Sequence, residues 1–194
     1  TVFGGLWDFS ANREHSDTAY TNEGIDLHTD GTYCEDPPGL QFLHCLAFDG
    51  EGGHSILADG FKVAEIMRET APDAFETLCK VSVPGQYIEP GIHLKAAHPV
   101  INLDKNGQLR QICFNNADRA PFLLDAPMQE KFYAALKIFH SYLSDREMQM
   151  RFQLVPGKAV LFDNWRVLHA RTAFTGHRHL AGFYMNKEDF ESKL

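Results

Sequence analysis

Short apolar segments separated by turn residues fill most of this chain. Four of them have the length and apolar content of strands: 39–48 (GLQFLHCLAF), 55–58 (SILA), 151–155 (RFQLV) and 159–163 (AVLFD). Gly and Pro mark the turns, at Pro37-Pro38-Gly39, Gly50 to Gly53, Pro84-Gly85 and Pro156-Gly157-Lys158. This pattern predicts many short strands joined by tight turns.

Two longer segments change to a helical period of three to four residues. The first, 61–81, places apolar residues at Val63, Ile66, Met67, Phe75, Leu78 and Cys79. We expect this helix to break near Pro72. The second, 128–143, places them at Phe132, Ala135, Leu136, Phe139 and Leu143. Short strands with two inserted helices predict a mainly β fold, a sandwich or jelly-roll barrel with helices packed outside.

The composition favours one globular domain spanning residues 1–194, with 44% hydrophobic residues to form its core. The sequence contains no apolar run long enough to predict a membrane span. A net charge of −8 argues against nucleic acid or an anionic membrane as partner. Because the chain begins TVFGG without Met, we expect further sequence before Thr1, which could include a targeting peptide.

The four cysteines are Cys34, Cys45, Cys79 and Cys113, and none forms a C-x-x-C pair. Such wide spacing disfavours both a disulfide framework and a zinc-thiolate site. We therefore expect free, buried thiols in a reducing compartment.

Two histidines and one aspartate suggest a metal site. His28 and Asp30 stand two apart in 25–33 (IDLHTDGTY), and in a strand such residues point to the same face. His169, in FDNWRVLHAR, is the candidate third ligand. Two imidazoles and one carboxylate on one face leave open positions on an octahedral iron, as non-haem Fe(II) oxygenases require. H-x-D alone is a weak signal, so this hypothesis depends on the other motifs.

Arg178 and Ser55 could hold a keto-acid co-substrate of such an iron. The far carboxylate of a keto acid needs a guanidinium, which binds it with two hydrogen bonds. Arg178 follows His169 far enough along the chain to return on a neighbouring strand, and Ser55, in GGHS, could add a hydroxyl. An Arg178 on a solvated face is the alternative.

Together the motifs resemble the clavaminate-synthase/taurine-dioxygenase-like Fe(II)/2-oxoglutarate oxygenases, and within them the carnitine-pathway branch. The resemblance covers essentially the whole chain. It depends on DTAYT (17–21), LHTDGTY (27–33), PPGLQFLHCL (37–46), GGHSILADGF (52–61), FNNADRA (114–120) and FDNWRVLHARTAFTGHRHL (162–180). One departure is His169-Ala170-Arg171, where the family usually has His-Gly-Arg.

The resemblance implies a double-stranded β-helix, or jelly roll, as the fold. It implies iron(II) held by His28, Asp30 and His169, and 2-oxoglutarate held by Arg178 with help from Ser55. It also implies dioxygen as a reactant, ascorbate as reductant and a small-molecule substrate. A location in the mitochondrial matrix or cytoplasm follows only from the family, which also allows a homodimer.

Both substrates of the branch carry a trimethylammonium group, which donates no hydrogen bond and is held by aromatic faces. By the family pattern Trp7, Tyr20 and Tyr184 form this cage, with Phe3 at a fourth position, although each could be a core aromatic. At its other end, ε-N-trimethyllysine has an α-ammonium that γ-butyrobetaine lacks. Asp17 could attract that ammonium, or could instead cap a turn.

Asn115 and Asn116 are expected at the polar end of the substrate, with Arg119 as a candidate for a carboxylate. Asn164 and Trp165 are expected to support the metal site rather than react. The predicted activity is Fe(II)- and 2-oxoglutarate-dependent hydroxylation of ε-N-trimethyllysine at carbon 3, a step of carnitine biosynthesis. Three alternatives stay open: γ-butyrobetaine as substrate, a non-catalytic module that binds quaternary ammonium groups, and a zinc hydrolase, disfavoured because no obvious Glu base accompanies the histidines.

Overall fold

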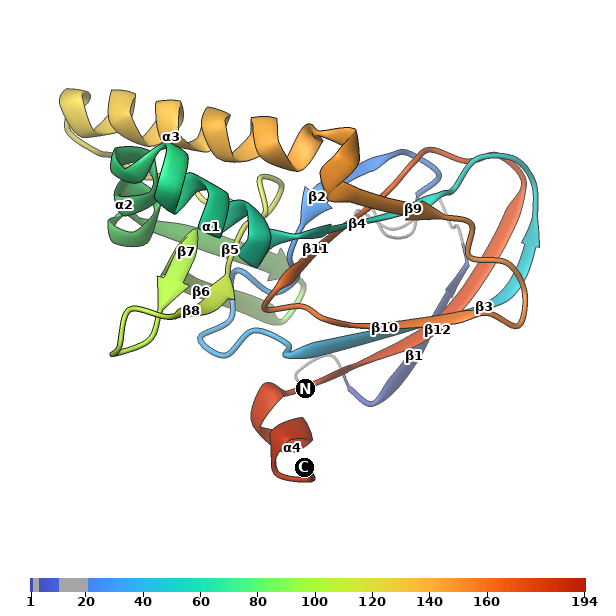
Figure 1. The fold of residues 1–194 in the computed structure, drawn as a ribbon. Helices are drawn as coiled ribbons and strands as arrows, with labels where there is room; N and C mark the ends of the chain where they lie inside the picture. The colour runs from blue at the N-terminus through green and yellow to red at the C-terminus, as the bar shows by residue number, and fades with distance from the viewer. Residues whose placement is uncertain (2–3, 11–20) are drawn as a thin grey trace.

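The computed structural model describes residues 1, 4–10 and 21–194, whose arrangement is shown in Figure 1. Strands enclose a barrel on one side, and three helices with two hairpins lie on the other. Within these ranges, no helix is both long enough and apolar enough to span a membrane.

Two four-stranded antiparallel sheets form the barrel. The first contains, in spatial order, β1 (Leu6–Ser10), β12 (His177–Met185), β3 (Leu40–Asp49) and β10 (Ala159–Asp163). The second contains β2 (Ile25–His28), β11 (Val167–Arg171), β4 (Ser55–Asp59) and β9 (Gln149–Phe152). Cys45 and Leu180 of the first sheet pack with Phe152 of the second, so both sheets contribute to one interior. The predicted jelly-roll class is confirmed.

Both predicted helical segments form helices, with bounds α1 (Gly60–Thr70), α2 (Pro72–Lys80) and α3 (Ala126–Ser144). The first segment divides at Ala71, as Pro72 predicts, because Pro fits the first turn of a helix but interrupts its interior. The Asp59 carboxylate begins α1 by accepting hydrogen bonds from the N–H groups of Phe61 and Lys62, at 3.0 and 3.2 Å.

The helices cover the outer face of the second sheet. Leu168 of β11 is fully buried against them and belongs to the same core as Met67, Phe132 and Phe139. Because side chains alternate along a strand, His169, which follows Leu168, points the other way, into the barrel. The helical core thus fixes which face of β11 reaches the interior.

Two hairpins complete the helical side: β5 (Ser82–Glu89) with β6 (Ile92–Pro99), and β7 (Ile101–Leu103) with β8 (Leu109–Ile112). The turn predicted at Pro84-Gly85 is wrong, since both residues lie inside β5. A Cβ on Gly85 would lie 2.6 Å from the carbonyl oxygen of Thr32. Glycine is needed there for close approach of two backbones and not for a turn.

Three predicted strands correspond to β3, β4 and β10, but the fourth, 151–155, is displaced. A short 3-10 helix (Arg146–Met148) ends at Met148, and β9 follows it directly, from Gln149 to Phe152. Leu154 is 1% exposed, because it turns into the barrel interior instead of continuing the ladder. The chain ends with the short helix α4 (Lys187–Glu191).

All four cysteines are free thiols, as their spacing predicts. Cys45 and Cys113 are buried as expected, but Cys34 and Cys79 are only half-buried. Burial raises the pKa of Cys79 to about 11 and that of Cys113 to about 12. These thiols therefore stay protonated and unreactive near neutral pH.

Phe139 of α3 is a sensitive position for stability, since it is fully buried and its ring meets Phe114 edge-on with centroids 5.4 Å apart. We expect Phe139→Ala to lower the free energy of unfolding by about 3–5 kcal/mol, from lost burial and the cavity left behind. Urea unfolding measures this. Leu123→Ala is the control, because Leu123 is 96% exposed and should change stability by less than about 0.5 kcal/mol. Equal losses in both variants would contradict the assigned core.

Candidate metal centre

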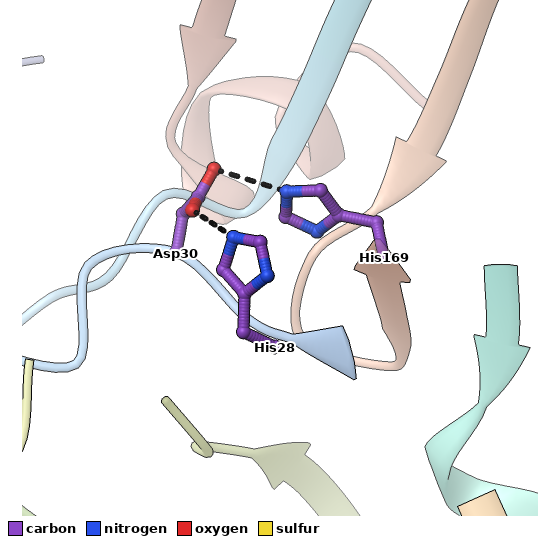
Figure 2. A group of neighbouring side chains, drawn as sticks. All are labelled: His28, Asp30 and His169. Carbon is purple, nitrogen blue, oxygen red and sulfur yellow. Dashed lines mark ion pairs between the residues drawn. The ribbon is translucent and has the colours of Figure 1, made fainter. Parts of the chain in front are cut away.

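Three side chains converge inside the barrel, as Figure 2 shows: His28 from the end of β2, His169 from β11 and Asp30 from the loop after β2. His28 and His169 are paired residues of neighbouring strands, with ring centroids 4.2 Å apart. One potential ligand atom from each of the three residues lies within 4.8 Å of the others. This donor set fits an octahedral Fe(II) ion that keeps open positions for other ligands.

The sequence argument placed Asp30 in a strand with His28, and this is wrong. β2 ends at His28, and Asp30 lies in a bend. The chain between them is held by Thr29, whose N–H donates to the carbonyl of Phe114 at 2.8 Å and whose Oγ1 accepts from the Phe114 N–H at 2.9 Å. His28 and Asp30 therefore converge because the intervening residue is fastened to another segment.

Asn164 holds the backbone of Asp30 from the opposite side. Its Oδ1 accepts the N–H of Asp30 at 2.9 Å, and its Nδ2 donates to the carbonyls of Asp30 at 3.0 Å and Pro38 at 2.8 Å. Next to it, the Nε1–H of Trp165 donates to the carbonyl of Pro37 at 3.0 Å. Asn164 is 1% exposed and stands just before β11, so it ties the Asp30 loop to the strand that carries His169.

The carboxylate of Asp30 organises the charges of the centre. Its two oxygens lie 3.2 Å from Nε2 of His28 and 3.5 Å from Nε2 of His169. Burial opposes ionisation of Asp30, but the charge and hydrogen bond of His169, together with those of His28, outweigh it and hold its pKa well below the usual range. The carboxylate is therefore ionised near neutral pH.

The two imidazoles titrate differently. Burial disfavours a charge on His28, but the hydrogen bond and charge of Asp30 outweigh burial and raise its pKa. Burial and the nearby charge of His28 lower the pKa of His169. His28 Nδ1 donates to the carbonyl of Asp26 at 2.7 Å, which leaves Nε2 directed at the centre. A proton on Nε2 of His28 would therefore compete with a metal ion for that nitrogen.

Arg178 lies deep in the same interior, on β12. It is 6% exposed, its guanidinium lies 5.6 Å from the ring centre of Phe174, and burial lowers its pKa. The predicted return on a strand next to His169 is wrong, because β11 and β12 belong to different sheets. Among the described residues no carboxylate forms an ion pair with Arg178. A buried guanidinium without a carboxylate is costly, so the position fits an anionic ligand.

Ser55 approaches the interior from the facing sheet. It pairs with Phe152 on β9, while Arg178 pairs with Phe48 on β3. Both phenylalanines pack on one apolar cluster, formed by Cys45, Leu154 and Leu180. Ser55 and Arg178 therefore flank the same part of the interior, and a shared ligand stays a prediction.

Two of the predicted cage aromatics lie together beside the centre. The rings of Trp7 and Tyr184 have centroids 5.4 Å apart and are tilted by 54°. A Cβ on Gly182 would lie 2.4 Å from the Trp7 ring, so the glycine makes room for the indole. The Tyr184 hydroxyl donates to Oδ2 of Asp30 at 2.8 Å. The other predicted pocket residues, Phe3, Asp17 and Tyr20, lie outside the described residues.

The segment after Phe114 is adjacent to the metal loop. Asn115 donates through Nδ2 to Oδ2 of Asp118 at 2.7 Å and accepts the Ala117 N–H at 2.9 Å. Asn116 is exposed, and the Arg119 guanidinium lies over the Tyr133 ring of α3, 5.5 Å from its centre. Substrate contact by Asn115 stays a prediction.

Sequence reasoning missed two residues of the barrel wall. Gln41 pairs with both Phe162 and Tyr184 across the first sheet, is 5% exposed, and its Oε1 has no hydrogen-bond partner in the described part of the chain. The ring centroids of Phe162 and His169 are 5.0 Å apart. A polar Gln at an inward position of a mostly apolar strand was the available signal.

Metal affinity should depend on pH through His28. Its raised pKa means that a proton competes with the metal, so affinity for Co(II) should fall as the pH drops through that pKa, by up to about tenfold per pH unit for one displaced proton. Asp30→Asn should weaken binding overall and move this fall to lower pH, because the charge that raises the His28 pKa is gone. Calorimetric titration at several pH values measures both effects. An affinity that is constant between about pH 5 and 8 would contradict the assignment.

Asn164→Ala should loosen Asp30 and weaken Co(II) binding by about tenfold, the lower end of the effect of losing a residue that orients a ligand. Asn102→Ala is a matched control, since the Asn102 amide also donates to a proline carbonyl, that of Pro99 at 2.8 Å, but belongs to the β7–β8 hairpin. The control should reduce stability without reducing metal affinity. Equal affinity losses would mean that Asn164 acts only through folding.

Comparison with known proteins identifies dioxygenases as relatives of this chain. The chain is 42% identical to a trimethyllysine dioxygenase of Meyerozyma guilliermondii, covering 100% of this chain and 50% of the relative. It is 40% identical to the mitochondrial trimethyllysine dioxygenase of Gallus gallus, covering 97% and 47%. A γ-butyrobetaine dioxygenase of Pseudomonas is 38% identical, covering 99% and 51%. The chain thus spans about half the length of the curated relatives it matches.

A solved structure with the same fold is a putative α-ketoglutarate-dependent taurine dioxygenase from Burkholderia xenovorans. It superposes with a TM-score of 0.69 at 16% identity, covering 94% of this chain and 64% of that one. The family model described as taurine catabolism dioxygenase TauD, TfdA family matches residues 1–184. The chain belongs to this TauD/TfdA dioxygenase family.

Proposed function

We propose that this chain holds Fe(II) through His28, Asp30 and His169 and hydroxylates ε-N-trimethyllysine at carbon 3, with 2-oxoglutarate and dioxygen as co-substrates. The observation that carries the proposal is that Tyr184 contacts both the metal centre and the aromatic pair. Its hydroxyl donates a hydrogen bond to Asp30, and its ring packs against that of Trp7. A metal centre beside an aromatic pair suits oxidation of a quaternary ammonium compound. Relatives named trimethyllysine dioxygenase are 37–42% identical to the chain.

The bound iron, with 2-oxoglutarate and dioxygen, would supply the oxidising chemistry. The protein supplies binding and placement. Arg178 would hold the far carboxylate of 2-oxoglutarate in a bidentate pair, assisted by Ser55. Cys45, Leu154 and Leu180, each 1% exposed or less, keep that part of the barrel dry. No side-chain base is required, because the substrate loses a hydrogen atom from an unactivated carbon.

The faces of Trp7 and Tyr184 would hold the trimethylammonium group, joined by Tyr20. A methylated ammonium offers no N–H, so ring faces and not hydrogen bonds supply the attraction. Asp17 and Asn115 would meet the amino-acid end, where an α-ammonium favours a carboxylate nearby. The proposal for trimethyllysine over γ-butyrobetaine is supported by Asp17 and by the names of the more similar relatives.

The main alternative is γ-butyrobetaine as substrate, favoured by the 38% identity with the Pseudomonas enzyme over nearly the whole chain. A non-catalytic ammonium reader would need neither the converging histidines nor a buried Arg178. The relatives from Gallus gallus and Homo sapiens are named mitochondrial, which supports the mitochondrial matrix over the cytoplasm for this protein. A homodimer stays a prediction.

A product assay on the full protein tests the function. With Fe(II), 2-oxoglutarate, dioxygen and ascorbate as reductant, mass spectrometry should detect 3-hydroxylated trimethyllysine and succinate in equal amounts. Product from γ-butyrobetaine alone would overturn the substrate assignment, and no iron-dependent succinate from either compound would overturn the activity.

Asp17→Asn should weaken trimethyllysine use more than γ-butyrobetaine use. Equal losses would remove Asp17 from substrate selection.

A further inference from the structure

The geometry points to Tyr184 as a positioning residue for the metal ligand Asp30, in addition to its place in the aromatic pocket. One side chain would then join ammonium recognition to metal geometry. The ammonium half of this inference rests on the proposed function, but the metal half does not, since it concerns a contact between two residues of the protein.

The hydroxyl contact is the first observation. Tyr184 donates to Oδ2 of Asp30 at 2.8 Å, while the other oxygen, Oδ1, is directed at Nε2 of His28 at 3.2 Å. A hydrogen bond from a neutral donor to an ionised carboxylate is short and strong, and it fixes the plane of the acceptor. Carboxylates that ligate metals are ordinarily held by such outer partners. Tyr184 therefore occupies the position of an outer partner for Asp30.

Asp30 needs this support because it lies outside any strand. Asn164 restrains its backbone through the N–H and the carbonyl, but neither contact restrains the rotation of its side chain. Among the described residues, the carboxylate is hydrogen-bonded by Tyr184 and faces only the two histidines otherwise. Because a bound metal would take both Nε2 atoms, the Tyr184 hydroxyl is the one of these three contacts that would still restrain the carboxylate in the loaded centre.

The ring of Tyr184 is itself held firmly. It lies on β12, where its backbone pairs with Gln41 of β3, and its face is tilted against Trp7, which packs over Gly182. Tilted aromatic faces of this kind form two walls of a cation site. Because these contacts hold the tyrosine side chain in one orientation, its hydroxyl stays on Asp30 while its ring face stays beside Trp7. A cation bound on the ring would therefore lie at a fixed distance from Asp30.

Two variants separate the two roles. Tyr184→Phe keeps the ring and removes the hydroxyl, so Co(II) affinity should fall about tenfold and the visible spectrum of bound Co(II) should change, while the KM for trimethyllysine stays within about twofold. Trp7→Leu removes the ring partner and keeps the hydroxyl of Tyr184, whose backbone is still held by the β12–β3 pairing, so its loss of Co(II) affinity should be clearly smaller than that of Tyr184→Phe. In Trp7→Leu the KM for trimethyllysine, and the inhibition constant of the non-ligating probe tetramethylammonium, should rise about tenfold.

Tyr142→Phe is the matched control, because the Tyr142 hydroxyl also makes one hydrogen bond, to Oγ1 of Thr70 at 2.9 Å, on the outer side of the helices. Unchanged Co(II) affinity and spectrum in Tyr184→Phe would overturn the inference, as would an equal loss in Tyr142→Phe. These metal titrations contain no substrate, so they succeed or fail independently of the product assay. If the wild-type protein forms no hydroxylated product, the proposed function fails while the role of Tyr184 toward Asp30 can still stand.

Discussion

The side chain of Asp30 must face two imidazoles that neighbouring strands hold in place, yet Asp30 itself lies in a bend. Strand pairing fixes the backbones of His28 and His169 against each other, whereas Asp30 lies beyond the end of β2 and needs other contacts. Three separate contacts remove its freedom: Thr29 is fastened to Phe114, Asn164 grips the Asp30 backbone, and Tyr184 meets the carboxylate. Because the contacting residues come from distant parts of the chain, the centre forms only when both sheets and the 114–118 segment are in place.

The charges of the interior explain why such a centre would take its ligands together. Asp30 contributes one negative charge, and Arg178, deeper in the barrel, contributes one positive charge without an acidic partner among the described residues. A divalent metal adds two positive charges, and 2-oxoglutarate adds two negative charges, one carboxylate toward each end. The loaded interior would therefore be close to neutral, whereas the metal or the keto acid alone would leave a net buried charge, which is costly.

Local sequence patterns predicted the helices and strands that depend mainly on neighbouring residues in the chain. Apolar runs placed β3, β4 and β10, and helical periodicity placed α1 to α3 with the break at Pro72. The errors occur where a distant backbone decides the conformation. Gly85 looks like a turn residue in the sequence, but it lies in a strand. Its lack of a side chain leaves room for the backbone of Thr32. Such contacts are invisible in the local pattern.

The candidate site shows the same limit. The motifs selected His28, Asp30 and His169, which the fold brings together, but strand alternation was the wrong reason for Asp30. The chain turns after Asp30 at Gly31, which has a φ of 77° and where a Cβ would lie 2.5 Å from Pro38. Only a glycine accepts that conformation beside the proline. The inward position of Gln41 and the Tyr184 contact to Asp30 depend on pairing between strands, which no single segment encodes.

Selection between the two candidate substrates must occur away from this centre. Both compounds carry a trimethylammonium group and both would be oxidised with the same keto acid, so on the proposed function the metal, Arg178 and the Trp7–Tyr184 pair would serve either one equally. Their difference is a charge at the opposite end. In the segment that follows Phe114, Asn115 donates a hydrogen bond to Asp118, and the Asp118 carboxylate is near enough to contribute to the raised pKa of His28. A negative charge near the amino-acid end of a substrate would attract an α-ammonium and repel a lone carboxylate. On the proposed function, the barrel would determine the reaction, and the charges beside it would determine the substrate.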